Sequence, residues 1–396
     1  MTSLGNIEAS HLAALTMVDF VTGDILYLTG TAQNLVGAEA QAIMPRQNAL
    51  TDIRISGYIF VRDALPVRQR PGTEPERSPY SPPIRLLAEE TPVGSLAQFD
   101  KDSAVTLIRV RIHSHDLATF TFETNNLKPI HFKPGQTAIL DFTDLVGEKK
   151  YAHMAPLKPT SVNDDRIRTW TISSADITPD GTKTFDLTMR EKPGGLVTGA
   201  LFTIARKCGA NRPELLEDFR PLGLRVKLVG IAGSFTFVKP PERPPVPQSA
   251  LWLAGGIGVT PFISMLTAIM QDKTYAGEWD IVLALSTREP EVLLPLLTSI
   301  LNCGRTPRLK LRLHVFSKLP VPRLPDKLQD GTYEGIDVAI IPHKTRVDDN
   351  FLSNVEDLTG RTAYMCGPEE FERGMLDLLG ARGIPSSAVV RESFEY

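Results

Sequence analysis

The sequence has 396 residues, of which 42% are hydrophobic and 22% charged, and its formal net charge is -3 at pH 7. This length predicts two or three domains, and the absence of a long run of one charge sign excludes a basic nucleic-acid-binding surface. No apolar run reaches the ~20 residues that span a bilayer. Residues 1–6 lack a basic region followed by an apolar one, so we expect neither a membrane span nor a secretory signal.

Three cysteines, Cys208, Cys303 and Cys366, lie far apart in the chain. An odd number of dispersed cysteines indicates a reducing compartment rather than a disulfide framework. We therefore expect a cytoplasmic protein. Three thiols are also too few for an iron–sulfur cluster, which normally takes four, and we expect neither a cluster nor another metal.

The first 70 residues predict a small β segment. A hairpin is expected from residues 14–19 and 24–30 around Thr22-Gly23-Asp24, followed by a strand over 54–61. About 70 residues are few for an independent core. A proline-rich stretch follows and predicts a linker over residues 71–98.

The middle segment, residues 99–239, predicts an antiparallel β-barrel or sandwich. Short β-branched or alternating runs are separated by turn residues such as Lys133-Pro134-Gly135. Many short strands in so few residues are typical of small closed sheets. The expected strands cover residues 105–112, 118–124, 137–142, 169–173, 184–190 and 224–229.

After a second proline-rich stretch, 239–247, residues 250–396 predict an α/β domain. Strands are expected at 250–254, 280–285, 310–316 and 362–365, and helices at 261–270, 292–301 and 369–379. This alternation predicts a parallel sheet covered on both faces. Ligands of such sheets bind beyond the carboxyl ends of the strands.

A glycine-rich turn follows the first of these strands. Gly255, Gly256 and Gly258 precede Thr260 and Pro261, where proline suits the first turn of a helix. Glycines let a phosphate approach the backbone, and the helix N-terminus offers free N–H groups. An ordinary tight turn explains the same residues, and the pattern departs from the usual Gly-x-Gly-x-x-Gly fingerprint.

Two further strand ends carry polar residues. Ser286 and Arg288 follow the second strand and suit a ribose 2′-phosphate, although a solvated loop explains them equally well. Cys366, Gly367 and Pro368 follow a later strand, where simple packing of the thiol is the alternative.

In the β segment, Arg168, Trp170 and Ile172 alternate with Thr169, Thr171 and Ser173. An arginine beside an aromatic ring and hydroxyls suits a phosphate and a flat ring, and an ordinary barrel strand is the alternative. Downstream, Gly195, Leu196, Val197 and Thr198 predict a helix start with donors for a pyrophosphate, or a simple loop.

Together these pieces resemble the ferredoxin–NADP reductase-like flavoenzymes over residues 99–396. The elements that carry the resemblance occur in the family's order: Arg168-x-Trp170-Thr171 with Ser173, Gly195–Thr198, Gly230–Phe235, Gly255–Pro261, Cys366-Gly367-Pro368 and Glu392-x-Phe394. Two departures are Trp170 in place of tyrosine, and Ile231-Ala232 where the family prefers proline and a bulky residue.

The resemblance implies FAD and a nicotinamide dinucleotide as cofactors. Arg168 and Gly195–Thr198 would hold the FAD phosphates, and Trp170 and Thr171 would border the flavin ring. Gly255–Pro261 would hold the dinucleotide, with Thr171, Cys366 and Phe394 at the reacting rings. NADPH is favoured over NADH because of Ser286 and Arg288. No fused iron–sulfur or globin signature is present, so we expect a separate electron acceptor, either a protein or a small molecule.

Residues 1–70 resemble the later half of the pyridoxamine-phosphate-oxidase-like FMN-binding split barrel, through Gly23–Gly30 and Ala40–Arg46. The earlier strands of that family have no counterpart, so we expect a partial domain without FMN. A β extension that packs on a neighbour is the alternative. Two alternatives to a reductase also stay open: a non-catalytic flavin-binding protein, and an FMN-dependent pyridoxamine-phosphate-type oxidase.

Overall fold

The computed structural model describes residues 2–44, 47–73, 78, 87–90, 103–125, 129–147, 155, 157, 159–176, 178, 180–236, 248–271, 278–302, 308–323 and 336–392. The chain forms two compact units, residues 1–93 with 150–164 and residues 94–149 with 165–395. The predictions for Cys303, Phe394, the stretch 239–247 and most of the linker 71–98 lie outside the described residues.

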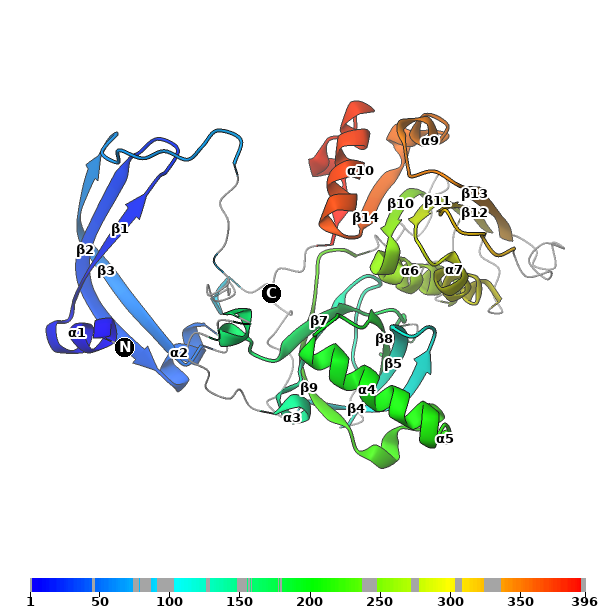
Figure 1. The fold of residues 1–396 in the computed structure, drawn as a ribbon, viewed down its shortest axis with the longest axis horizontal. Coiled ribbons are helices and arrows are strands. Elements are labelled where there is room, and N and C mark those ends of the chain that lie inside the picture. The colour runs from blue at the N-terminus through cyan, green and yellow to red at the C-terminus, as the bar shows by residue number, and fades with distance from the viewer. Residues whose placement is uncertain are drawn as a thin grey trace. The chain divides into compact units, whose positions relative to one another are not determined.

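The first unit contains a three-stranded antiparallel sheet in the order β1-β2-β3 (Figure 1). The predicted hairpin is confirmed, because Val18 pairs with Ile25 across the turn. The predicted third strand is also present and is longer than expected. The resemblance to a split barrel stays a prediction. The elements are α1 (Thr2–Ser10), β1 (Leu12–Val18), β2 (Ile25–Val36), α2 (Ala38–Ile43), β3 (Ala49–Val61) and the 3-10 turn η1 (Pro159–Asn163).

The second unit begins with a six-stranded antiparallel sheet in the order β7-β6-β9-β4-β5-β8. Its end strands meet where the Ser173 N–H donates to the Asp186 carbonyl at 2.8 Å, which closes the sheet into a barrel. The strands are β4 (Ala104–Ile112), β5 (Leu117–Thr124), β6 (Thr137–Asp141), β7 (Ile167–Thr171), β8 (Thr184–Arg190) and β9 (Arg225–Ala232).

Alternation along each strand fills the barrel. Ala118, Phe120 and Phe122 of β5 are fully buried in one core with α4, since every second side chain of a strand points to the same face. The six strands confirm the prediction of an antiparallel barrel, with β7 displaced two residues toward the N-terminus. The helices are α3 (Thr143–Val146), α4 (Leu196–Asn211), α5 (Glu214–Glu217) and the 3-10 turn η2 (Arg220–Leu222).

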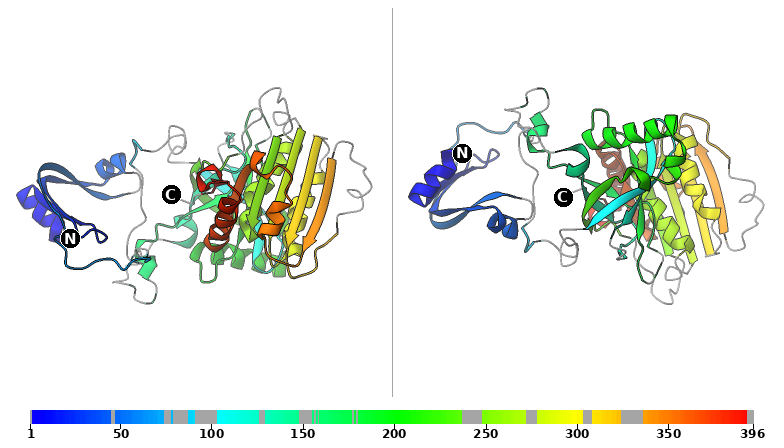
Figure 2. Two further views of the ribbon diagram at one scale, coloured as in Figure 1. Left: turned by 90° about the horizontal axis from the view of Figure 1, so that it is seen from above. Right: turned by 90° about the horizontal axis from the view of Figure 1, so that it is seen from below.

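The rest of the unit is a parallel sheet in the order β13-β12-β11-β10-β14-β15. Helices α6 and α7 cover one face, and α9 and α10 cover the other (Figure 2). The predicted α/β fold is confirmed. The strands are β10 (Gln248–Gly255), β11 (Glu278–Ser286), β12 (Arg308–Phe316), β13 (Ile336–His343), β14 (Thr362–Cys366) and β15 (Val390–Arg391).

The sequence had not predicted β13, which contains Pro342 and lies at the edge of the sheet, where proline is tolerated because one side of the strand needs no donor. Among the described residues no helix is both long and apolar enough to cross a membrane. The helical elements are η3 (Gly256–Val259), α6 (Thr260–Gln271), α7 (Pro290–Thr298), η5 (Ile300–Asn302), α9 (Asp349–Ser353), η6 (Leu358–Gly360), α10 (Glu369–Ala381) and η7 (Ser386–Ala388).

Helix α6 is buried on nearly all sides because it lies between the parallel sheet and the barrel. Ser264 Oγ donates to the Ser174 carbonyl of the barrel at 2.6 Å. The ring of Phe235, which follows β9, packs edge-on against Phe262 of α6 and Tyr364 of β14. The two halves of the second unit therefore share a packed junction.

Candidate functional site

The strand order of the parallel sheet reverses between β10 and β14. Chain order runs outward from β10 through β11 to β13 on one side, and through β14 to β15 on the other. Helices from opposite faces diverge at such a point and leave a crevice beyond the carboxyl ends of the strands. The carboxyl ends of β10, β11 and β14, at Gly255, Ser286 and Cys366, lie together at this edge of the sheet, which we call the rim.

The glycines of the predicted turn are required by close packing at this rim. A Cβ on Gly258 would stand 2.2 Å from the Cys366 carbonyl oxygen, and one on Gly255 would meet the ring of Phe371 at 2.9 Å. Gly256 differs: its φ is 55°, and no described atom lies within 4 Å of the position of a Cβ. Its backbone is therefore open to a ligand, as a phosphate-binding turn requires.

The polar residues predicted after β11 lie beside this turn. Ser286 pairs in register with Gly255. Arg288 is exposed, and no described residue pairs with its guanidinium. By contrast, Arg190 of β8 forms ion pairs with Asp116 and Glu289. The guanidinium of Arg288 is thus available to an anion at this rim.

At the end of β14, Cys366 is joined to the barrel by a carboxylate. Glu392 is 8% exposed, and its Oε2 accepts a hydrogen bond from Cys366 Sγ at 2.9 Å. Its Oε1 accepts one from Thr171 Oγ1 of β7 at 2.5 Å. The carboxylate therefore brings together the predicted flavin strand and the predicted nicotinamide strand end.

This buried cluster favours neutral side chains. Burial, with the nearby charge of Glu372, raises the pKa of Glu392, although the hydrogen bonds from Cys366 and Thr171 oppose the shift. Burial and the charge of Glu392 raise the pKa of the Cys366 thiol well above its usual range. Cys366 therefore stays protonated at neutral pH and donates a hydrogen bond to Glu392. It does not act as a nucleophile there, because a thiol must ionise to do so.

The alternation predicted for β7 agrees with the structure. Ile172 is buried in the barrel core and Trp170 packs partly buried against it, with its ring edge-on to Phe142 at 5.5 Å. Ser173 Oγ lies 2.9 Å from Thr188 Oγ1 and 3.1 Å from the Asp186 carbonyl. Arg168 Nη1 donates to the carbonyl of Ile167.

The predicted helix start at Gly195 is observed. Gly195 is the N-cap of α4, and no side chain caps this helix within the described part of the chain. The N–H groups of Leu196, Val197 and Thr198 occupy the first turn, where a helix has no acceptors of its own. Thr198 Oγ1 accepts from the N–H of Lys192 at 3.1 Å, which fixes the approaching loop.

Glu392 was not among the candidate site residues, although it belongs to the terminal motif. The motif indicated the position of Phe394, but only the fold shows that Glu392 reaches Thr171, 221 residues earlier. Glu372 was also missed. Its Oε1 accepts from the Gly367 N–H at 3.3 Å, and burial raises its pKa.

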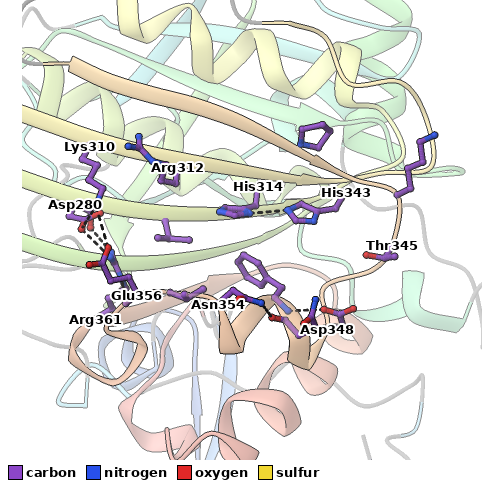
Figure 3. Close-up of a pocket in the computed structure, with 16 residues that line it drawn as sticks. Asp280, Lys310, Arg312, His314, His343, Thr345, Asp348, Asn354, Glu356 and Arg361 are labelled. Carbon is purple, nitrogen blue, oxygen red and sulfur yellow. Dashed lines mark hydrogen bonds and ion pairs between the residues drawn. The ribbon is translucent and has the colours of Figure 1, made fainter.

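A cavity of about 670 Å³ lies elsewhere, between α9 and the face of β11–β13 (Figure 3). His314 Nδ1 and His343 Nε2 lie 2.9 Å apart in it, and burial lowers the pKa of His314 to about 4. Asp280 pairs with Lys310 and Arg361. None of the predicted site residues lines this cavity.

The second unit thus combines an antiparallel barrel with a parallel α/β sheet packed against it. No family model matches the chain. It is 24% identical over 291 residues to the reductase subunit of stachydrine N-demethylase from Rhizobium meliloti (strain 1021). The match covers 70% of this chain and 63% of that protein, so the chain spans less than two thirds of the length of this curated relative.

Several solved structures are similar to about three quarters of the chain. The flavohaem-like FAD/NAD-binding domain of nitric oxide dioxygenase from Vibrio cholerae O1 biovar El Tor has a TM-score of 0.45 at 15% identity, covering 74% of this chain and 98% of that chain. A cytochrome P450 reductase from Amycolatopsis has a TM-score of 0.44 at 17% identity, covering 74% and 70%. Phthalate dioxygenase reductase has a TM-score of 0.41 at 16% identity, covering 74% and 67%.

Proposed function

We propose that the chain is an NAD(P)H-dependent flavoprotein reductase, with FAD on the barrel and the dinucleotide at the rim of the parallel sheet. The observation that carries the proposal is the bridge from Thr171 through Glu392 to Cys366. It joins the flavin strand of the barrel to the rim of the sheet, and transfer between two bound cofactors needs their sites to adjoin. The name of the curated relative, a reductase subunit, supports the same assignment.

The side chains and backbone fit these cofactors. Open backbone at Gly256 suits a pyrophosphate, and the uncapped first turn of α4 suits a second one. The partly exposed ring of Trp170 suits one side of a flavin. FAD, when bound, supplies the redox chemistry by accepting a hydride from the nicotinamide and releasing electrons singly or in pairs.

The protein orients the reacting groups and excludes water from them. Thr171 and Cys366 are 4% and 3% exposed, so the cluster around Glu392 is dry. We assign Thr171 and Cys366 to the neighbourhood of the reacting rings, and Arg168 with residues 195–198 to the FAD phosphates. Arg288 and Ser286 would bind the 2′-phosphate of NADPH.

For the acceptor, we propose a separate protein component. The curated relative is named as one subunit of an N-demethylase, which places its reductase and its oxidising component on different chains.

The deciding experiment is an anaerobic absorbance titration with NADPH, after the flavin released by heat has been identified. Bleaching of an FAD band near one equivalent of NADPH supports the reductase. A yellow protein that NADPH and NADH both leave oxidised would indicate the non-catalytic alternative. Release of FMN instead of FAD would favour the oxidase alternative.

A further inference from the structure

One ion pair of the second unit joins the regions proposed for the two cofactors. Arg190 is the last residue of β8 and precedes the loop that leads to Gly195 and the first turn of α4. Glu289 is the N-cap of α7 and directly follows Arg288. The Arg190 guanidinium pairs with the Glu289 carboxylate, so a barrel residue is bound to the segment that follows β11 at the rim.

The same guanidinium has a second acidic partner in the barrel. Its Nη1 donates to Asp116 Oδ2 at 2.5 Å, and the Ser114 hydroxyl donates to Asp116 Oδ1 at 2.9 Å. The side chains of Arg190, Asp116 and Glu289 are 29%, 20% and 28% exposed, so solvent screens their charges only in part. One cation thus neutralises two carboxylates incompletely, and it is shared between the barrel and the rim.

The backbone around Arg288 is fixed on both sides. The Thr287 N–H donates to the Phe316 carbonyl at 3.0 Å, and the Glu289 N–H donates to Thr287 Oγ1 at 3.0 Å. Adjacent Cα atoms lie about 3.8 Å apart. The carboxylate of Glu289 is therefore close to any anion that binds to the guanidinium of Arg288.

An unpaired carboxylate at this place would repel a phosphate. A phosphate monoester carries a charge of about -1.5 to -2 at pH 7, and like charges within about 8–10 Å are not fully screened at moderate salt. NADPH has such a group on its 2′ oxygen, whereas NADH has a hydroxyl there. The charge of Glu289 therefore acts mainly on the binding of NADPH.

We propose that Arg190 sets the nucleotide specificity by masking the carboxylate of Glu289, so that the 2′-phosphate of NADPH can bind at Arg288. Among the described residues, Arg190 alone forms an ion pair with Glu289. Arg190 acts through Glu289 and needs no contact with the nucleotide. The inference rests on the proposed function, because it requires the dinucleotide at the rim.

The test measures dissociation constants of NADP⁺ and NAD⁺ by calorimetry on the oxidised holoprotein, with which neither nucleotide reacts. At low ionic strength, Arg190→Gln should raise Kd for NADP⁺ about 10-fold and leave Kd for NAD⁺ within about twofold. Glu289→Gln should lower Kd for NADP⁺ about threefold. The double substitution should lie within about threefold of the unmodified protein, because the charge that Arg190 masks is then absent.

Salt and a second ion pair provide the controls. At about 0.5 M salt the effect of Arg190→Gln on NADP⁺ should fall below about threefold, because the screening length shortens. Arg308 forms the same kind of pair with Glu278, at the opposite ends of β12 and β11 from the rim. Arg308→Gln should therefore change neither dissociation constant.

Equal weakening of NADP⁺ and NAD⁺ by Arg190→Gln would show a structural tie without masking and would overturn the inference, as would a double variant as weak as Arg190→Gln. If Arg190→Gln does not fold, as judged by circular dichroism, Glu289→Gln decides alone: tighter NADP⁺ binding supports masking, and unchanged or weaker binding overturns it. An unmodified protein that binds neither nucleotide would overturn the proposed function together with this inference. Normal NADP⁺ binding by folded Arg190→Gln would overturn the inference alone.

Discussion

Glu392 connects the barrel of the second unit to its parallel sheet. It is buried, it accepts hydrogen bonds from one barrel residue and one rim residue, and its raised pKa reflects burial first and the charge of Glu372 second. Burial penalises the charged form of this carboxyl group, and the hydrogen bonds from Cys366 and Thr171 partly offset that penalty.

The raised pKa of Glu392 makes stability depend on pH. The folded protein holds a proton that the unfolded chain releases above its ordinary pKa of 4.5, so this contribution is present at low pH and is lost as the pH rises through the folded pKa. Glu392→Gln should therefore flatten the fall in Tm between pH 4.5 and 8. At pH 8 its Tm should exceed that of the unmodified protein by a few degrees. Each kcal/mol of unfolding free energy corresponds to about 2–4 °C in Tm for a unit of this size.

Thermal unfolding followed by circular dichroism across this pH range checks the prediction. Glu369→Gln is the control, because that carboxylate is exposed on the surface of α10. Curves for Glu392→Gln that run parallel to those of the unmodified protein would contradict the assignment.

The thiol of Cys366 should affect the redox step without acting as a nucleophile. Cys366→Ala removes the hydrogen bond to Glu392 and opens space at the rim, so the rate of NADPH-dependent flavin reduction should fall about 10- to 100-fold, equivalent to roughly 1.4–2.8 kcal/mol in the barrier. Stopped-flow absorbance measures this rate.

Cys208 provides the control for this substitution. It is buried in the barrel core on α4, away from the rim, so Cys208→Ala should leave the rate within about twofold. A Cys366→Ala protein that reduces its flavin at the normal rate would show that the thiol is only a packing residue.

At the scale of the elements, strands could be predicted where the sequence has a continuous apolar run or a strict alternation of apolar and polar residues. Residues 250–254, 280–285 and 310–316 became β10, β11 and β12, with extensions of one or two residues at both ends of β10 and β11 and at the first end of β12. Strand β13 was not predicted; its apolar run, residues 338–341, is short and ends at Pro342 and His343. The order of the strands did not follow from the residues, because it depends on pairings between segments far apart in the chain.

The same distinction applies to the site. The glycine turn was predictable because close packing leaves no room for a Cβ at Gly255 and Gly258. Ser286, Arg288 and Cys366 were chosen for their side-chain chemistry, and their roles stay predictions. Glu392 could not be assigned, since its partners lie 26 and 221 residues away. The prediction that Phe394 covers a flavin face stays a prediction.

The rim after β11 should decide between NADPH and NADH. Arg288→Ala should raise KM for NADPH about 10- to 100-fold, because a charge-assisted hydrogen bond to phosphate contributes roughly 1.5–3 kcal/mol, and leave KM for NADH nearly unchanged. Steady-state kinetics with both nucleotides measure this. Arg308, exposed at the opposite end of β12, is the control: Arg308→Ala should change neither constant. Equal increases in KM for NADPH and NADH in Arg288→Ala would contradict the assignment of Arg288 to the 2′-phosphate.

At the scale of the whole molecule, one buried aromatic side chain contributes to the junction between the barrel and the parallel sheet. Phe235 is 1% exposed and contacts α6 and β14 from the barrel side. Phe235→Ala should lower the free energy of unfolding by about 3–5 kcal/mol. It should also separate the calorimetric transition of the second unit into two.

Phe122→Ala is the matched comparison, since Phe122 is equally buried but lies inside the barrel. It should destabilise the unit by a similar amount while leaving a single transition. If both substitutions leave one transition, the junction does not depend on Phe235.

The pairing of β4 with β9 has a consequence for synthesis of the protein. The Leu107 N–H donates to the Leu224 carbonyl at 2.9 Å, and Val105 pairs with Val226, more than 100 residues later in the chain. At 5–20 residues per second a ribosome takes roughly 6–25 s to reach that point. Throughout this interval one edge of β4, with Val105 and Leu107 beside it, is unpaired on the nascent chain. The yield of soluble protein should therefore depend on chaperones that bind emerging chains and on growth temperature.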